Sequence, residues 1–332
     1  MEIQRLETIT RPGLFDCEVS PDGAAVAAVY REDDGQRLGL WSTAGCRLLM
    51  NLDLPGPYAQ PRFDPEGRRL AAAHLARQLT IWSLLDGEEV FTTSFQRPEI
   101  TAYAFGRRGE TIVIAQGDHL GVWSVDEGRP VASLAMPAPV RTLRSSPDGR
   151  LLGVGLDVGG AVLVDIEART TLATLPEITQ AVTALGFHPS EPRLMAATAP
   201  SFVTDTGRPR RTGHGWAHVW DYRTGEQITR IPCDYQAALL SQGHYLATLT
   251  NNSRSLWIWR IVPTTDLVAH IENAVPELLI DERGREIRQA TLAATLRGDV
   301  FAVAGLARPI SAVGVLRLFA FHAEAVPQVG RA

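Results

Sequence analysis

The chain contains no lysine: all 32 of its basic residues are arginine. Phosphate-binding loops of the Walker type and Schiff-base catalysis both need an amine on a flexible stem, so the absence of lysine excludes both. We attribute the bias to a GC-rich genome. The 37 acidic residues outnumber the basic ones, and the net charge of −5 argues against a general binder of nucleic acids or anionic membranes.

Cysteine is also scarce. Cys17, Cys46 and Cys233 are an odd number at wide spacing, which fits neither a disulfide framework nor a zinc pattern. The first residues lack the apolar segment of a signal peptide, and no apolar run reaches the length of about 18 residues that a membrane span needs. We therefore expect a cytoplasmic protein from a reducing compartment, without membrane contact.

An internal repeat is present instead. An apolar alternation that ends in tryptophan and is followed by a glycine turn reads "LGLWSTAG", "LTIWSLLDG", "LGVWSVDEG" and "AHVWDYRTG", and weaker copies read "AVLVDIEAR", "LWIWRIVP" and "VLRLFAFH". The anchor residues of the seven copies are Trp41, Trp82, Trp123, Val164, Trp220 with Asp221 after it, Trp259 and Phe319. Successive anchors are 41, 41, 41, 56, 39 and 60 residues apart, so two steps contain insertions.

A second landmark lies about twenty residues before each anchor. It reads "SPDG" from Ser20 and from Ser146 and is less regular elsewhere. Proline presets the turn, aspartate bonds its own backbone and glycine takes a positive φ, so the string predicts a tight turn. The run that follows is rich in Ala, Val and Gly, which is typical of a strand buried on both faces. Each repeat is therefore expected to hold four strands, a to d.

Four short antiparallel strands cannot bury both faces of their sheet alone. Radial stacking of such sheets does bury them, and closing the ring removes the exposed ends. Small residues on strand b let the sheets approach near the axis, and the tryptophan of strand c fills the wider gap further out. The sequence predicts an all-β fold, a single seven-bladed β-propeller over residues 1–332, with four-stranded antiparallel blades.

These repeats resemble the WD40 family across essentially the whole chain, in period, in "PDG" turns and in a repeated Trp followed by Ser or Asp. The match is degenerate, since literal Trp-Asp occurs only at Trp220–Asp221. The resemblance implies a closed propeller in which the last blade is completed by the chain start. We expect residues 2–9 to supply that closing strand, because little strand-forming sequence follows Phe319.

Two insertions interrupt the period. In blade 5, "APSFVTDTGRPRRTGHGW" (199–216) lies between strands b and c, and "ENAVPELLIDERGREI" (272–287) lies between blades 6 and 7. In the WD40 family these connections leave from one face, which we call the loop-bearing face. Loops on a rigid scaffold often carry function. The expected partner-binding residues are Arg208, Arg210, Arg211, His214, Trp216, Leu278, Leu279 and Ile280.

Each insertion allows two interpretations. Arginine forks bind carboxylate and phosphate well, so the first insertion is a docking site for an acidic or phosphorylated partner segment, or else a solvated loop with Trp216 covering blade edges. The apolar stretch 276–280 is a hook for a partner, or an extra piece of structure lying on the propeller.

Other apparent motifs have structural explanations. The spaced glycines of "GVGLDVGG" (153–160) lie on an expected strand and its turn, with no helix to present phosphate-binding N–H groups. His214 and His218 are of a type that binds metals, but His218 falls on an expected strand, where packing is the simpler role. No G-x-S-x-G or H-E-x-x-H string occurs. We expect no metal ion and no cofactor.

The sequence suggests three candidate functions. The first is a non-enzymatic scaffold or adaptor in a multi-protein assembly, which the WD40 resemblance implies. The second is a metal-dependent propeller hydrolase or lactonase with a site in the central channel, for which the entries of strands a offer few ligands, chiefly Asp16 and Glu18. The third is nucleic-acid binding, for which three clustered arginines on an acidic protein are too short a footprint. We expect the first, with protein partners and no nucleic acid.

Overall fold

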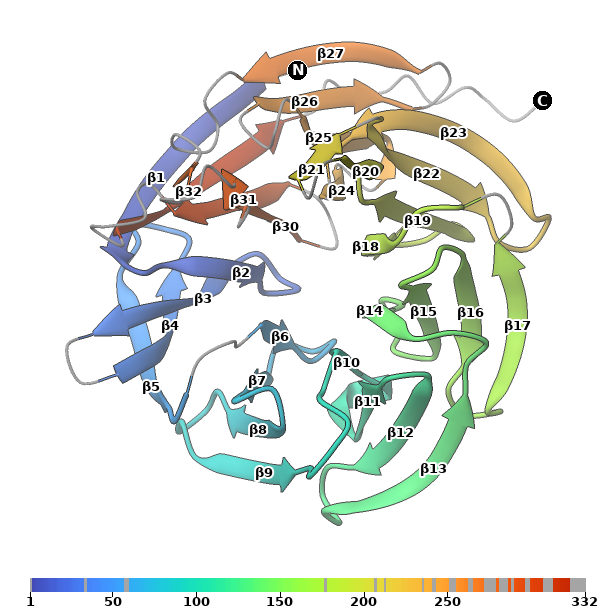
Figure 1. The fold of residues 1–332 in the computed structure, drawn as a ribbon. Coiled ribbons are helices and arrows are strands. Elements are labelled where there is room, and N and C mark those ends of the chain that lie inside the picture. Colours follow the sequence, from blue (N-terminus) through green and yellow to red (C-terminus); the bar gives the residue numbers. More distant parts are fainter. Residues whose placement is uncertain are drawn as a thin grey trace, which may run out of the picture.

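The computed structural model is a ring of seven four-stranded antiparallel sheets around a central opening (Figure 1). It describes residues 2–32, 35–56, 60–175, 178–205, 208–211, 213–234, 236–240, 243–250, 255–261, 265–271, 279–280, 286–287, 290–295, 299–306 and 313–322. The predicted fold, an all-β seven-bladed propeller, is confirmed. In the part of the chain so described, no helix has the length and apolar character that crossing a membrane requires.

The strands follow one another outward from the axis within each blade. Blades 1 to 3 consist of β2 (Phe15–Val19), β3 (Ala25–Glu32), β4 (Gly35–Ser42), β5 (Leu48–Leu54); β6 (Pro61–Phe63), β7 (Arg69–His74), β8 (Gln78–Ser83), β9 (Glu89–Ser94); and β10 (Ala102–Phe105), β11 (Thr111–Gln116), β12 (His119–Ser124), β13 (Arg129–Ala135), with a 3-10 turn, η1 (Arg107–Gly109), after β10. Blades 4 to 6 consist of β14 (Val140–Ser145), β15 (Leu151–Leu156), β16 (Ala161–Asp165), β17 (Thr170–Leu175); β18 (Val182–Phe187), β19 (Arg193–Thr198), β22 (Gly215–Asp221), β23 (Glu226–Cys233); and β24 (Ala237–Leu240), β25 (Tyr245–Thr250), β26 (Ser255–Arg260), β27 (Asp266–Ile271).

Both ends of the chain build blade 7. Its strands are β30 (Ala290–Ala294), β31 (Val300–Leu306), β32 (Val313–His322) and β1 (Glu2–Pro12). The register of β1 on β32 runs from Glu2 opposite His322 to Pro12 opposite Val313. The predicted closing strand is therefore confirmed, and it extends three residues beyond the expected 2–9 because the pairing continues to Pro12.

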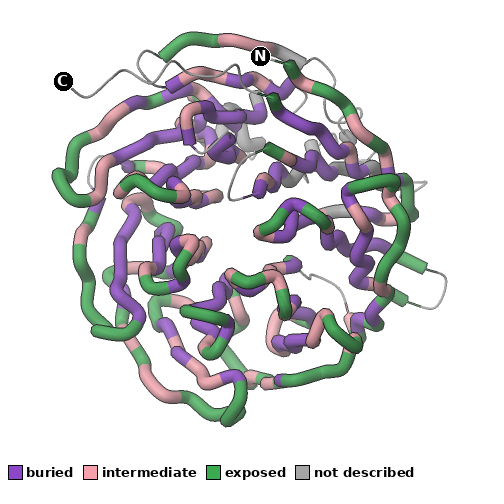
Figure 2. The backbone as a smooth tube through the Cα atoms, turned by 180° about the vertical axis from the view of Figure 1, so that it is seen from behind, coloured by how far each residue is buried: buried purple, intermediate pink, exposed green. Residues whose placement is uncertain are grey.

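The core consists of seven hydrophobic clusters, and each lies between two neighbouring blades. Each anchor residue packs against the preceding blade; Trp41, for example, joins Leu316 and Leu318 of blade 7. Five anchors are buried, namely Trp41, Trp82, Val164, Trp220 and Phe319, whereas Trp123 and Trp259 are half-buried. Figure 2 shows the same distribution, with buried segments inside the ring and exposed segments along its outer edge.

The turns between strands a and b are held by the polar residues that predicted them. In blade 1, Ser20 Oγ donates to Asp22 Oδ1 at 2.6 Å and accepts from the N–H of Ala25 at 2.9 Å. Blade 4 repeats this arrangement with Ser146, whose Oγ lies 2.5 Å from Asp148 Oδ1. In blade 5 the Nδ1 atom of His188 accepts two backbone N–H groups instead. These turns satisfy their own backbone groups locally, which makes them readable from the sequence.

Candidate interaction surface

The blade 5 insertion forms a separate hairpin. Strand β20 (Phe202–Asp205) pairs with β21 (Arg208–Arg211) in a two-stranded antiparallel sheet, between strands β19 and β22 of the blade (Figure 1). The predicted arginines Arg208, Arg210 and Arg211 thus lie on one strand, with Arg208 opposite Asp205 in the register. Side chains of residues 202–211 lie outside the described part of the structure.

Gln180 joins the two ends of this insertion. Its Nε2 donates to Ser201 Oγ at 2.6 Å, just before β20, and to the carbonyl of His214 at 3.2 Å, after β21. Its Oε1 accepts from Thr198 Oγ1 at 2.9 Å, and that hydroxyl accepts from the N–H of Trp216 at 2.9 Å. Because Thr198 is fully buried, the hairpin rises from a rigid base in the blade rather than from a loose loop.

Trp216 is not part of the insertion, and the predicted boundary at 216 is wrong. Strand β22 begins at Gly215, and Trp216 pairs with Pro232 of β23. The half-buried indole lies under the guanidinium of Arg230, whose carbon is 3.8 Å from the ring centroid. The strand starts earlier than expected because Thr198 and Cys233, from neighbouring strands, provide pairing partners that the local sequence does not show.

The two histidines of "HGWAH" differ in environment. His214 is exposed, next to the base of the hairpin. His218 is buried on β22, its ring stacked on that of Trp220 with centroids 5.0 Å apart, and its Nδ1 lies 2.9 Å from Gln227 Oε1. The packing role expected for His218 agrees with these contacts.

The second insertion also contains a hairpin. Strand β28 (Leu279–Ile280) pairs with β29 (Glu286–Ile287), between the last strand of blade 6 and the first of blade 7. Leu278 lies outside the described residues, as do the side chains of Leu279 and Ile280. Because strands alternate in direction within a blade, connections from b to c and from d to the next a leave at the same end. The topology therefore carries both hairpins on one face, the loop-bearing face.

Glu18, one of the two residues expected to ligate a metal in the channel, is engaged in other contacts. The carboxylate of Glu18 accepts hydrogen bonds from Arg62 and Arg144. Burial raises the pKa of the Cys17 and Cys233 thiols, and these two residues and Cys46 form no disulfide. A carboxylate held by two guanidinium groups and a buried protonated thiol are poorly suited to ligate a metal or to act as a nucleophile. Across the described residues, no group of three metal-ligating side chains occurs.

Gln180, Thr198 and Arg230 were not predicted from the sequence. Gln180 lies 21 residues before Ser201 and 34 before His214, so no local pattern connects them. Arg230 on β23 contacts Trp216 on the neighbouring strand β22. This contact becomes predictable only once the register between strands c and d is known.

Comparison with known proteins identifies a similar sequence and similar solved structures. No protein-family model matches the chain. Over 182 residues it is 29% identical to eukaryotic translation initiation factor 3 subunit I of Lodderomyces elongisporus, a match that covers 52% of this chain and 50% of that protein. The chain thus spans about half the length of the curated relative it matches. The β-propeller domain of Cps50 (Swd1) from Myceliophteria thermophila aligns with 97% of this chain and 100% of that one, at 14% identity and a TM-score of 0.71, which shows a shared fold.

Proposed function

Because the chain belongs to the WD40-repeat β-propeller family, with degenerate repeats, we propose that it is a non-enzymatic scaffold or adaptor that binds partner proteins on its loop-bearing face. In this proposal residues 1–332 form one propeller domain. The observation that carries it is the β20–β21 hairpin, an addition to the regular four-stranded blade 5 that is held at its base by Gln180. One similar protein is by name a subunit of a larger factor, which supports a role within an assembly.

The chemistry of the hairpin suggests its partner. Arg208, Arg210 and Arg211 place three guanidinium groups within four residues, and one of them lies opposite an acidic residue in the pairing. Guanidinium groups form paired, charge-assisted hydrogen bonds with carboxylate and phosphate. We propose that the partner presents an acidic or phosphorylated segment. The net charge of −5 supports a protein rather than a nucleic acid in this role.

We propose that the protein acts in the cytoplasm. Unpaired Cys17, Cys46 and Cys233 support a reducing compartment. A metal-dependent hydrolase is the weaker alternative, since the contacts of Glu18 with two arginines favour a structural role for one of the two residues expected to ligate the metal.

Affinity purification from the native host with mass spectrometry tests the proposal. The comparison uses the native sequence, the triple variant R208A/R210A/R211A, and a control triple variant R68A/R107A/R129A. The control removes three arginines at the opposite face. Arg68 and Arg107 lie on turns between strands a and b, and Arg129 is the first residue of β13. Their side chains are 66%, 55% and 64% exposed, respectively. A partner lost only from the hairpin variant supports the docking site. Binding of the purified partner is then measured before and after phosphatase treatment, which distinguishes recognition of phosphate from recognition of carboxylate. Equal retention by both variants contradicts it and directs attention to residues 272–287.

A further inference from the structure

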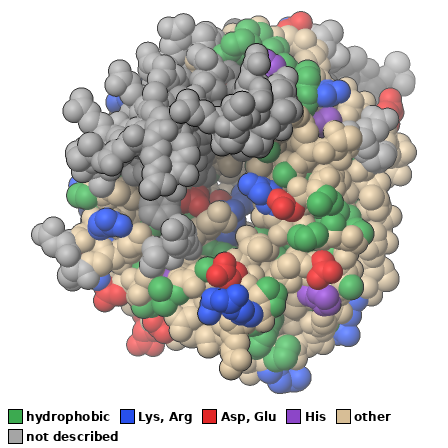
Figure 3. Space-filling view, in the orientation of Figure 1, with side chains coloured by type: hydrophobic (Ala, Val, Ile, Leu, Met, Phe, Trp, Pro, Cys, Tyr) green, Lys and Arg blue, Asp and Glu red, His purple; other side chains and the backbone are tan. Residues whose placement is uncertain are grey.

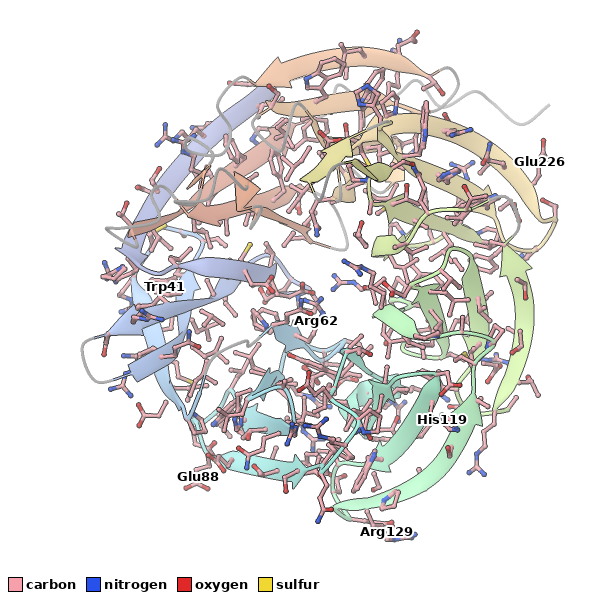
Figure 4. All side chains as sticks on the ribbon, in the orientation of Figure 1. Trp41, Arg62, Glu88, His119, Arg129 and Glu226 are labelled. Atoms are coloured by element: carbon pink, nitrogen blue, oxygen red, sulfur yellow. The ribbon has the colours of Figure 1, made fainter. Side chains whose placement is uncertain are left out.

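A pocket opens at the other end of the central channel, among the turns that join strands a and b. Four charged residues line it. Glu18 on β2, Arg62 on β6 and Arg144 on β14 come from three blades and form its floor, and the buried Asp64 follows β6. Figure 4 shows Arg62 directed toward the centre of the ring. Figure 3 views the molecule from the loop-bearing face, where acidic and basic side chains gather around the central hollow. Arg144 comes from blade 4 and meets Glu18 of blade 1 across the channel.

The three floor residues form a compact cluster. Glu18 is 7% exposed, and its two oxygens are shared between the arginines: Oε1 lies 2.5 Å from Arg144 Nη1 and Oε2 lies 3.3 Å from Arg62 Nη1. Arg62 Nη1 also donates to the carbonyl of Pro61 at 2.9 Å, and Arg62 lies in the electric field of Asp16 as well. Arg62 is therefore matched by acidic groups on its own side of the channel.

Arg144 has more donor capacity left than Arg62, which donates two hydrogen bonds. A guanidinium carries five N–H donors, and the structure gives Arg144 one bond, to Glu18. Its side chain is 29% exposed, and no nitrogen of Arg144 is among the described buried side-chain atoms that lack a partner. Because Arg144 lines the pocket and its side chain is partly exposed, an incoming anion can reach it.

The rim of the pocket has a different chemistry. Pro21, Pro65 and Pro147, from three equivalent turns, surround the opening, and Phe63 contributes an aromatic ring. Apolar walls above a guanidinium favour a ligand whose carboxylate is flanked by apolar groups, because burying those groups against the walls is favourable. A small hydrated ion has no apolar surface to bury there.

We propose that this pocket binds a peptide segment of a partner protein in which an acidic side chain is flanked by apolar residues. The acidic side chain bonds to Arg144 on the channel floor, and the flanking residues contact the proline rim. Glu18 competes with the acidic side chain of the peptide for Arg144 and so lowers the affinity of the pocket, while its bonds hold both arginines in position. This surface lies on the face opposite the β20–β21 hairpin and does not depend on the function proposed above.

Two fluorescein-labelled peptides that differ only in their acidic residues test the proposal. One alternates leucine with glutamate, the other leucine with glutamine, and binding is followed by fluorescence anisotropy. We expect the glutamate peptide to bind, R144Q to weaken it about tenfold or more, and E18Q to strengthen it several-fold by releasing Arg144. R141Q is the matched control, because Arg141 lies on the same strand but pairs with Asp157 at 2.7 Å.

Each result has a defined meaning. Circular dichroism of every variant establishes folding, and R144K, which keeps the positive charge, replaces R144Q if that variant does not fold. Equal binding of the two peptides, or unchanged affinity in R144Q, overturns the proposal. Weakening by E18Q also overturns it, since Glu18 would then be part of the binding surface rather than a competitor. Inorganic phosphate that displaces the peptide at equal concentration would indicate a site for free anions instead. The variant R208A/R210A/R211A is expected to bind the peptide normally, which separates this site from the hairpin.

Discussion

Replacing Gly39 by alanine is expected to disturb the packing of the Trp41 anchor. Gly39 lies two residues before Trp41 on β4, on the same face of the strand. A Cβ at position 39 would lie 2.2 Å from Cη2 and 2.6 Å from Cζ3 of the Trp41 indole. Ordinary carbon contacts are about 3.5–4.0 Å. The indole must therefore move by more than 1 Å, roughly, or leave its site.

The site gives the indole little room to move. Trp41 is 1% exposed in the cluster between blades 7 and 1, and the ring of Tyr30 lies 5.5 Å away, centroid to centroid. Overpacking of this kind costs about 1–3 kcal/mol. We expect Gly39→Ala to lower the free energy of unfolding by that amount, measured by urea unfolding followed by circular dichroism and tryptophan fluorescence.

Gly121 provides the matched control. It occupies the same place before Trp123 in blade 3, but its added Cβ would meet Nε1 of Trp123 at 3.1 Å, and that indole is only half-buried. Gly121→Ala is expected to cost less than about 1 kcal/mol. In a Trp41→Leu background the effect of Gly39→Ala should largely disappear, since the clash is with the indole. A Gly39→Ala variant as stable as the native protein, or equal losses at both glycines, would refute the reasoning.

Two further predictions concern stability. Burial lowers the pKa of His188 from an ordinary 6.5 to about 4. Between these two pH values His188 is protonated in the unfolded chain but neutral in the folded chain. Stability is expected to fall as the pH drops from 6.5 to 4, by at most about 3 kcal/mol, and His188→Asn should flatten this part of the melting-temperature profile; an identical profile would contradict it. Deleting residues 1–10 should lower the melting temperature far more than Ile9→Ala does, because the deletion exposes β32 as well as the cluster around Ile9. Ile9→Ala alone is expected to cost about 2–4 kcal/mol of stability. An unchanged melting temperature after the deletion would rule out ring closure by β1.

Some features of the fold were readable because their chemistry is local. Trp41, Trp82 and Trp123 recur at equal spacing because each fills the same gap between two blades, and Ser20 with Asp22 closes its own turn. A bulge between strands c and d was not predicted from the sequence. In blades 1 to 6 the pairing of strands c and d shifts by one residue at the anchor, for example between Leu40 and Trp41. Such bulges disturb the exposed outer edge of a sheet and hinder pairing with another chain.

The candidate sites were only partly predictable. The length of the blade 5 insertion and the arginines within it follow from the sequence, but its hairpin and its attachment through Gln180 do not. Trp216 was misassigned because the start of β22 depends on its partners in two other strands. These partners are set by the sheet register rather than by neighbouring residues.

The sequence by itself determined the number of blades, their strand order and the segment that closes the ring, because periodic burial and turn formation depend on residues within one repeat. Only the tertiary structure decided which charged groups meet on the channel floor. Glu18 and Arg144 are 126 residues apart, and they touch because closing the ring brings the inner strands of blades 1 and 4 to a common axis. A repeat pattern specifies what each strand looks like, whereas contacts across the axis depend on the position of every blade at once.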